Sequence, residues 1–172
     1  MSPVAIRVAE AADAAACREI YAPYVTDTVI TFEYDVPSVA ELQRRIAGAY
    51  RWLIAERDGE LIGYAYAGPF KARAAYDWAC EVSVYLRQGL RRTGAGRALY
   101  TQLLDDLTEC GFRTAVGVIT VPNEASVGLH TALGFRPVGT FERIGWKHGG
   151  WHDVYWCRRE LGPDPEAPPR FR

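Results

Sequence analysis

The sequence predicts an α/β (α+β) protein with a mixed central sheet and helices on both faces. Two helical patterns come early, strands joined by a tight turn follow, and the chain then alternates strand, helix, strand, helix, strand. Hydrophobic residues make up 49% and charged residues 24% of the 172 residues, which is typical of a globular chain. We therefore expect a single domain over residues 1–161 and a proline-rich, disordered tail over residues 162–172.

Apolar runs with strand-like patterning predict the strands. They cover residues 6–9, 52–56, 61–67, 79–86, 115–121, 136–141 and 153–159. The Asp58-Gly59 pair predicts a tight hairpin, so the two strands that flank it should be antiparallel neighbours. Residues 28–34 are β-rich but irregular, and residues 142–152 are expected to form a polar, aromatic connection between the last two strands.

Capping residues and apolar residues at helical spacing predict the helices. Asp13 and Ser38 are placed to cap two helices before the main strands. A third helix is expected over residues 96–110, where a leucine recurs at every fourth position and Gly111 stands at the left-handed C-terminal cap. Asn123 is placed to cap a fourth.

Charge and cysteine content exclude several classes of protein. Lys and Arg total 20 against 21 Asp and Glu, and the net charge of −1 favours neither nucleic acid nor an anionic membrane. No signal-peptide pattern and no run of about 18 apolar residues is present, so we expect a cytoplasmic protein without a membrane anchor. The four cysteines match no zinc or redox spacing and are expected to be reduced core thiols; the three histidines lack a convincing ligand set, so we expect no metal.

The most informative motif is a basic, glycine-containing loop between a strand and a helix. Residues 87–97 contain four arginines and no acidic residue, and Gly94 and Gly96 leave room at the start of the helix. Free N–H groups and the positive end of the helix dipole make such a terminus a phosphate site. Walker and Rossmann patterns do not match, because no Lys-Ser or Lys-Thr follows and the third glycine is missing. The alternative is a surface turn with solvated arginines.

This loop and its surroundings resemble a known family. Val84-Tyr85-Leu86 followed by Arg-x-x-Gly-x-Gly is similar to the acyl-CoA motif of the GNAT superfamily of N-acetyltransferases. Three further stretches resemble the phosphinothricin and methionine sulfone or sulfoximine N-acetyltransferases: residues 66–73, 76–78 and 147–153. The resemblance runs from about residue 4 to residue 161 and implies a mostly antiparallel sheet, acetyl-CoA as cofactor and a homodimer.

The resemblance also implies which residues hold the cofactor. The backbone of Val84, Tyr85 and Leu86 would pair with the pantetheine arm as a strand would. The pyrophosphate would lie on the loop residues Arg91, Arg92, Thr93, Gly94, Ala95, Gly96 and Arg97. Asn123 and Ser126 would also contact the cofactor.

Glu81 is the candidate general base. An ammonium substrate must lose a proton, directly or through water, before its nitrogen can attack a thioester. Strand alternation over residues 79–86 places Glu81 on one face with Ser83 and Tyr85. The resemblance supports a catalytic role; the alternative is a carboxylate that points to solvent or pairs with an arginine.

Two further groups are candidates for the chemistry. His130 lies seven residues after Asn123, where many superfamily members have a tyrosine that protonates the departing thiolate. His130 is therefore a candidate acid, and a capped or packed histidine is the alternative. The main-chain N–H of Leu86 is the candidate donor to the oxyanion.

Residues outside the periodic segments are candidates for recognising the acceptor. They are Phe32, Glu33, Lys71, Arg73, Ala74, Ala75, Tyr76, Lys147 and His148. The guanidinium of Arg73 suits a substrate carboxylate. Together with the resemblance, this predicts acetyl transfer to the amino group of a small amino acid or analogue (phosphinothricin, methionine sulfone or methionine sulfoximine) by direct attack through a tetrahedral intermediate. Acetylation of a protein N-terminus or other amine, and a non-catalytic acyl-CoA-binding module, are the alternatives.

Overall fold

The computed structural model describes residues 3–90 and 94–162, so most of the predicted tail lies outside the described residues. The strands are β1 (Ala5–Val8), β2 (Arg51–Arg57), β3 (Glu60–Pro69), β4 (Ala79–Leu86), β5 (Thr114–Val121), β6 (Arg136–Lys147) and β7 (Gly150–Glu160). The α-helices are α1 (Ala14–Asp27), α2 (Val39–Gly48), α3 (Ala95–Glu109) and α4 (Glu124–Ala132). Two short 3-10 helices, η1 (Ala11–Asp13) and η2 (Ala74–Tyr76), complete the described elements.

All seven described strands form one sheet in the order β1-β2-β3-β4-β5-β7-β6. Each neighbouring pair is antiparallel except β4 and β5, which run parallel. The β2–β3 hairpin turns at Asp58 and Gly59, whose φ angles of 53° and 80° are both in the left-handed region. An Asp-Gly pair accepts that conformation at low cost, which is why the sequence predicted the hairpin correctly.

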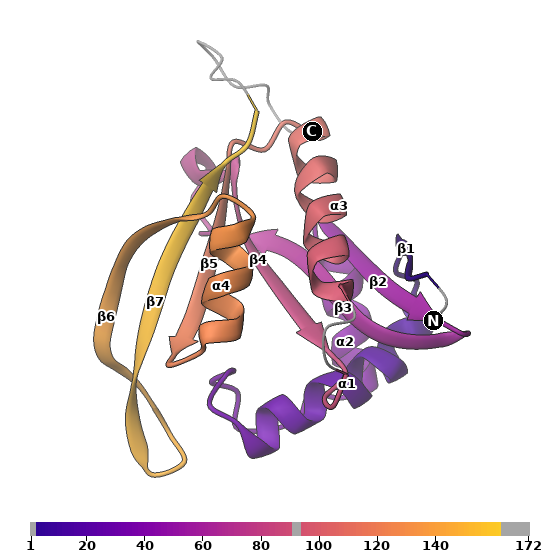
Figure 1. The fold of residues 1–172 in the computed structure, drawn as a ribbon, viewed down its shortest axis with the longest axis horizontal. Coiled ribbons are helices and arrows are strands. Elements are labelled where there is room, and N and C mark those ends of the chain that lie inside the picture. Colours follow the sequence, from indigo (N-terminus) through magenta and orange to yellow (C-terminus); the bar gives the residue numbers. More distant parts are fainter. Residues whose placement is uncertain (1–2, 91–93, 163–172) are drawn as a thin grey trace.

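Helices cover both faces of the sheet (Figure 1). Residues of β2 alternate between the two: Leu53 and Ala55 belong to the core under α3, whereas Trp52 and Ile54 belong to the core under α1 and α2. Helix α3 contributes its buried leucines to the first of these cores. This arrangement confirms the predicted fold class, a mixed and mostly antiparallel sheet between two helical layers.

Side-chain caps begin two of the helices as predicted. The Ser38 hydroxyl accepts a hydrogen bond from the Glu41 amide at 3.1 Å and so caps α2. The Asn123 side chain accepts from the Ser126 amide at 3.1 Å and caps α4. Gly111 follows α3 with a φ of 91°, the left-handed conformation expected for a C-terminal glycine.

Asp13 stands at the N-cap position of α1 as predicted, but its side chain makes no capping hydrogen bond to that helix. The short helix η1 precedes α1, and the Asp13 carboxylate accepts from the Glu10 amide at 2.7 Å, one turn before α1. The same carboxylate pairs with Arg7 at 2.8 Å. The Asp13 side chain therefore stabilises the entry to η1 and ties it to β1.

The largest difference from the sequence prediction is the end of the sheet. The stretch expected to be a connection, residues 142–152, is mostly strand: β6 and β7 continue through it and turn only after Lys147. β6 is an edge strand whose side chains are exposed on both faces, so it shows no alternation of apolar and polar residues. A further difference is Cys110, which is exposed, whereas the other three cysteines are buried as expected.

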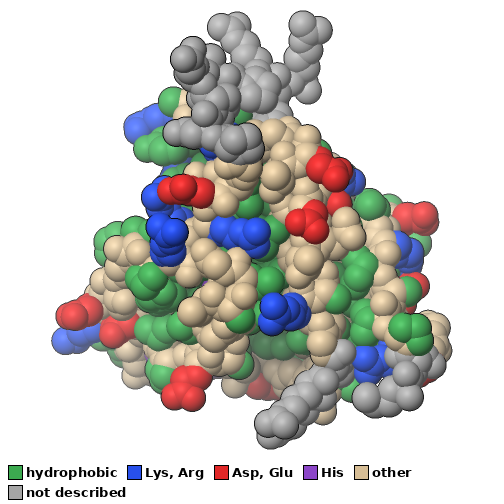
Figure 2. All heavy atoms as spheres, turned by 45° about the horizontal axis from the view of Figure 1, so that its top comes forward, with side chains coloured by type: hydrophobic (Ala, Val, Ile, Leu, Met, Phe, Trp, Pro, Cys, Tyr) green, Lys and Arg blue, Asp and Glu red, His purple; other side chains and the backbone are tan. Residues whose placement is uncertain are grey.

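Basic and acidic side chains both occur across the face drawn in Figure 2, which agrees with the near-neutral total charge. Within residues 3–90 and 94–162, no helix has the length and apolar character needed to cross a membrane.

Candidate active site

The site begins where the two parallel strands separate. β4 and β5 pair only from Ala79 opposite Thr114 to Val82 opposite Gly117, although both strands continue for several residues. Beyond Val82 the facing edges of the two strands no longer pair with each other. A gap therefore opens within the sheet.

The register of β4 against β3 decides which amides face this gap. The Arg87 amide donates to the Ile62 carbonyl at 2.8 Å. Hydrogen-bonded residue pairs alternate with non-bonded pairs along an antiparallel ladder. Tyr85 is therefore in the next hydrogen-bonded pair with β3. Val84 and Leu86 are in non-bonded pairs, so their N–H and C=O groups point away from β3. The Leu86 carbonyl accepts from the Tyr24 hydroxyl at 2.7 Å. This geometry offers an extended amide-containing ligand a strand-like edge.

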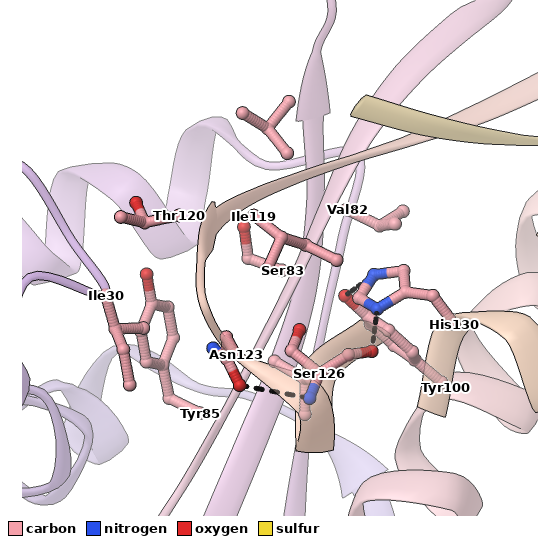
Figure 3. Close-up of a pocket in the computed structure, with 12 residues that line it drawn as sticks. Ile30, Val82, Ser83, Tyr85, Tyr100, Ile119, Thr120, Asn123, Ser126 and His130 are labelled. Carbon is pink, nitrogen blue, oxygen red and sulfur yellow. Dashed lines mark hydrogen bonds between the residues drawn. The ribbon is translucent and has the colours of Figure 1, made fainter. Parts of the chain in front are cut away.

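A pocket occupies the gap (Figure 3). Its lining combines both diverging strands with α4 and one residue each from α3 and the loop after α1. The lining residues are Ile30, Val82, Ser83, Val84, Tyr85, Tyr100, Val118, Ile119, Thr120, Asn123, Ser126 and His130. Four predicted cofactor residues are thus brought together, Val84 and Tyr85 from β4 and Asn123 and Ser126 from the start of α4.

The N-terminus of α3 follows the end of β4 and is built without bulky side chains. Gly94 precedes the helix with a φ of 73° and carries no side chain that could cap the first turn. Gly96 packs closely, because a Cβ there would lie 3.3 Å from the Leu86 side chain. Arg97 is exposed on the first turn. First-turn N–H groups, the helix dipole and an exposed guanidinium together suit a pyrophosphate.

Three of the predicted pyrophosphate residues, Arg91, Arg92 and Thr93, lie outside the described residues. Their assignment to the cofactor stays a prediction.

His130 is held by two hydrogen bonds in the wall of the pocket (Figure 3). Its Nδ1 lies 2.8 Å from the Ser126 carbonyl, which only accepts, so Nδ1 carries the proton. Its Nε2, 3.2 Å from the Tyr100 hydroxyl, is then the acceptor. The ring is 3% exposed and packs over Gly117, where a Cβ would lie 2.8 Å from it. Burial lowers the pKa of His130, so the neutral ring is favoured.

Glu81 is half-buried and lies on the other face of β4 from the buried Cys80 and Val82. Burial raises the pKa of its carboxyl above the ordinary 4.5, and the nearby positive charge of Lys71 opposes that shift. A carboxyl whose pKa is moved toward neutrality is suited to accept a proton from an ammonium group. The predicted strand face is correct, because Glu81 alternates with the core residues of the strand.

The sequence analysis did not assign two residues to the site, one opposite the neighbour of Glu81 and one beside Lys71. Tyr66 lies opposite Ser83 in the β3–β4 register, and its hydroxyl bonds with Ser83. Burial raises the pKa of Tyr66, and the charge of Glu81 adds to that shift. Trp156 of β7 lies 5.8 Å from the ammonium of Lys71, measured to the ring centroid. Pairing between distant strands brings these residues together, so only the sheet order could have revealed them.

The predicted acceptor residues lie in separate segments. Phe32 is half-buried in the loop after α1 and faces His152 at a ring-centroid distance of 6.3 Å. Arg73, Ala74, Ala75 and Tyr76 are exposed around η2, between β3 and the strand that carries Glu81. Tyr76 contacts the ring of Phe70 at 5.7 Å, and His148 lies in the turn after β6 with a φ of 49°.

One expected acceptor residue does not fit that role. Lys147 was expected in a loop that reads the substrate, but it is the last residue of β6 and only 2% exposed. Its ammonium donates to the carbonyls of Val25 and Thr31 at 2.7 and 2.8 Å. Strand pairing buries it, which the irregular local sequence did not indicate. In the described part of the chain, no three His, Cys, Asp or Glu side chains are grouped so as to hold a metal ion.

Comparisons with known proteins agree with this geometry. A family model for an acetyltransferase (GNAT) domain matches residues 6–156. The chain belongs to the GNAT acetyltransferase family. It is 44% identical over 171 residues to a phosphinothricin N-acetyltransferase of Streptomyces viridochromogenes, covering 98% of this chain and 92% of that protein.

Two further GNAT relatives are similar over nearly their whole length. An L-methionine sulfoximine/L-methionine sulfone acetyltransferase of Salmonella typhimurium is 32% identical, covering 95% of this chain and 97% of that protein. The crystal structure of a phosphinothricin acetyltransferase from Sinorhizobium meliloti in complex with AcCoA superposes with a TM-score of 0.93 at 37% identity, covering 98% and 94% of the two chains. These findings confirm the predicted family, the acetyl-CoA-dependent N-acetyltransferase activity and the cofactor.

Proposed function

We propose that this GNAT enzyme acetylates the amino group of a small amino acid or amino-acid analogue. The observation that carries the proposal is the placement of Glu81, a half-buried carboxyl with a raised pKa, on the strand that also lines the cofactor gap. The relatives named for phosphinothricin and for methionine sulfoximine and sulfone support an acceptor of this size and charge.

In this proposal, groups of the protein remove the proton from the acceptor ammonium and stabilise the negative charge that develops on the acetyl oxygen. Acetyl-CoA, when bound, supplies an acetyl group activated as a thioester. Glu81 removes a proton from the acceptor ammonium, directly or through water, so that the nitrogen becomes a nucleophile. The Leu86 amide, directed away from β3, is available to stabilise negative charge on the acetyl oxygen.

His130 is a candidate acid whose contacts favour a positioning role. Its Nδ1 proton is already donated to Ser126, and its Nε2 accepts from Tyr100. A proton for the departing thiolate would have to come from a ring that burial keeps neutral. A thiol has a pKa of about 8.5, so its thiolate leaves without obligatory protonation.

Recognition of the acceptor is proposed for two segments, the loop between α1 and α2 and the turn around η2 between β3 and β4. Arg73 presents a guanidinium on an exposed turn, and such a group pairs with a carboxylate through two parallel hydrogen bonds. Phe32, Ala74, Ala75 and Tyr76 would complete the walls around the acceptor side chain.

We also propose that the enzyme is a homodimer. Its edge strand β6 and the neighbouring β7 expose large apolar side chains, each between 48% and 61% accessible. They are Val138, Phe141, Ile144, Trp146 and Trp151. Apolar side chains gathered on one hairpin mark an association surface. A second copy can bury them in a two-fold interface.

Release of free thiol from acetyl-CoA tests the acceptor class. The panel contains L-amino acids, methionine sulfone, methionine sulfoximine, phosphinothricin and a short peptide with a free N-terminus. We expect turnover with at least one small amino acid or analogue and much slower turnover with the peptide. Turnover with the peptide alone would replace the proposal with N-terminal acetylation, and no turnover with any amine would leave acyl-CoA binding as the function.

A further inference from the structure

The buried ammonium of Lys147 joins three parts of the molecule. It lies at the end of β6 and bonds the carbonyls of Val25, near the end of α1, and of Thr31, in the following loop. Carbonyls in the last turn of a helix have no partner within it and carry the negative end of its dipole. A buried ammonium is costly unless it is hydrogen-bonded, so this position favours keeping all three parts in contact.

Residues 28–34, which we call the acceptor loop, have further ties to the β6–β7 hairpin. The Tyr34 hydroxyl donates to the Trp146 carbonyl. The Phe32 ring lies against Gly145, where an added Cβ would overlap the ring, so only glycine admits this contact. From α1, the Tyr21 hydroxyl bonds the Thr31 hydroxyl at 2.6 Å. A loop without helix or strand is thus fixed at several points.

The acceptor loop is connected with the groups around Glu81. Glu33 forms an ion pair with Arg45 of α2 at 2.6 Å. Burial is the main cause of the raised pKa of Tyr66, and the charges of Arg45 and Glu33 act on it in opposite directions. The Tyr66 hydroxyl bonds with Ser83, the neighbour of Glu81 on the same strand face. Displacement of the loop would therefore move Phe32 and separate the Glu33 carboxylate from Arg45.

We propose that Lys147 is a positioning residue, whose ammonium fixes the acceptor loop so that Phe32 forms one wall of the acceptor site. The inference rests on the proposed function for its reference to an acceptor. Lys147 does not touch the reacting atoms; it acts through the Thr31 carbonyl and the loop backbone.

Steady-state kinetics of Lys147→Met test this role. The methionine has a similar length but donates no hydrogen bond. We expect the KM for the acceptor to rise by about tenfold or more, because a charged hydrogen-bond donor is lost, while the KM for acetyl-CoA stays within about twofold. Arg136→Met, the same change of charge at the exposed start of β6, is the matched control and should change neither constant.

A second variant and a second measurement keep the test decisive if Lys147→Met folds poorly. Tyr34→Phe removes only the bond to the Trp146 carbonyl from an exposed side chain and should raise the acceptor KM by about threefold. Hydrogen exchange of the acceptor-loop amides, measured without substrates, should become faster in both variants and stay unchanged in Arg136→Met.

The two measurements separate this inference from the proposed function. If the wild-type enzyme acetylates no amino acid, the proposed function fails, while hydrogen exchange still reports whether Lys147 fixes the loop. Unchanged exchange in both variants, or an equal rise in both KM values, would overturn the positioning role.

Discussion

Glu81 is the residue on which the proposed chemistry depends most. A raised pKa means that its basic form accumulates only above that pKa, so kcat/KM should fall as the pH is lowered through a value above 4.5. Glu81→Gln should lower kcat by about 10²- to 10⁴-fold and abolish this acid limb. Steady-state turnover measured across a range of pH reports both effects.

Binding of acetyl-CoA is the control for Glu81→Gln, because the substitution should change the chemistry and leave the cofactor site intact. The dissociation constant of acetyl-CoA, measured by calorimetry, should be unchanged in Glu81→Gln, and Glu160→Gln, an exposed carboxylate at the far end of β7, should keep full activity. A Glu81→Gln enzyme with the wild-type rate and pH profile would exclude Glu81 as the base.

Gly117 is required by the packing of His130. A Cβ at this position would lie 2.8 Å from the ring and 2.9 Å from the Cys157 sulfur. Gly117→Ala should therefore lower the free energy of unfolding by about 1–3 kcal/mol, measured by urea denaturation. Gly128→Ala, on an exposed turn of α4 where a Cβ meets nothing within 4 Å, should instead raise it by about 0.5–1 kcal/mol. Equal free energies of unfolding for Gly117→Ala and Gly128→Ala would contradict the packing of His130 over Gly117.

Single residues differ in how far the sequence predicted them. The strand face of Glu81 followed from alternation alone, because β4 is regular. The contact between His130 and Tyr100 did not follow from the local sequence, because Tyr100 lies on another helix. Lys147 was misassigned for the same reason: its acceptors lie more than a hundred residues away in the chain.

The N-terminus of α3 is the element predicted to hold the pyrophosphate. Gly94 and Gly89 both have positive φ, and an added Cβ would meet nothing within 4 Å at either position. Alanine at either position should therefore lower the free energy of unfolding by a similar amount, about 1 kcal/mol, through backbone strain. Only Gly94→Ala alters the start of the helix. We expect its dissociation constant for acetyl-CoA to rise about tenfold, while that of Gly89→Ala stays at the wild-type value. The same increase in both variants would argue against a site at the helix terminus.

Elements with a clear period or cap were predicted well. β4 has the bounds that alternation indicated, and α2 and α4 begin at their predicted caps. The β6–β7 hairpin was underestimated because β6 lies at the edge and neither of its faces is consistently buried. The gap between β4 and β5 was not predicted, since divergence of two strands leaves no mark in local sequence. The resemblance implied only that the backbone of residues 84–86 pairs with the pantetheine arm.

At the scale of the whole molecule, the apolar surface of β6 and β7 predicts self-association. Trp151→Glu places a charge within this surface and should shift the enzyme from dimer to monomer in sedimentation velocity experiments. Val39→Glu, the same kind of change at an exposed residue in the first turn of α2, is the control and should leave the mass unchanged. A wild-type monomer at all concentrations would contradict the proposed dimer.

The order of elements along the chain was enough to predict the layers of the fold. Helices that come before and between the strands pack on both faces of the sheet that the strands form. The site required more. It combines β3, β4, β5, β7, α4 and the acceptor loop, which are separated in the sequence and meet only through the sheet order.

Identification of the acetylated product is the most direct test of the central claim. Purified enzyme is incubated with acetyl-CoA and L-methionine sulfone, L-methionine sulfoximine or phosphinothricin, and the product is analysed by mass spectrometry and NMR. We predict one acetyl group on the α-amino nitrogen of at least one acceptor, formed by the wild-type enzyme and at least about 100-fold more slowly by Glu81→Gln. Absence of an N-acetylated amino acid with every acceptor, while acetyl-CoA still binds, would contradict the account.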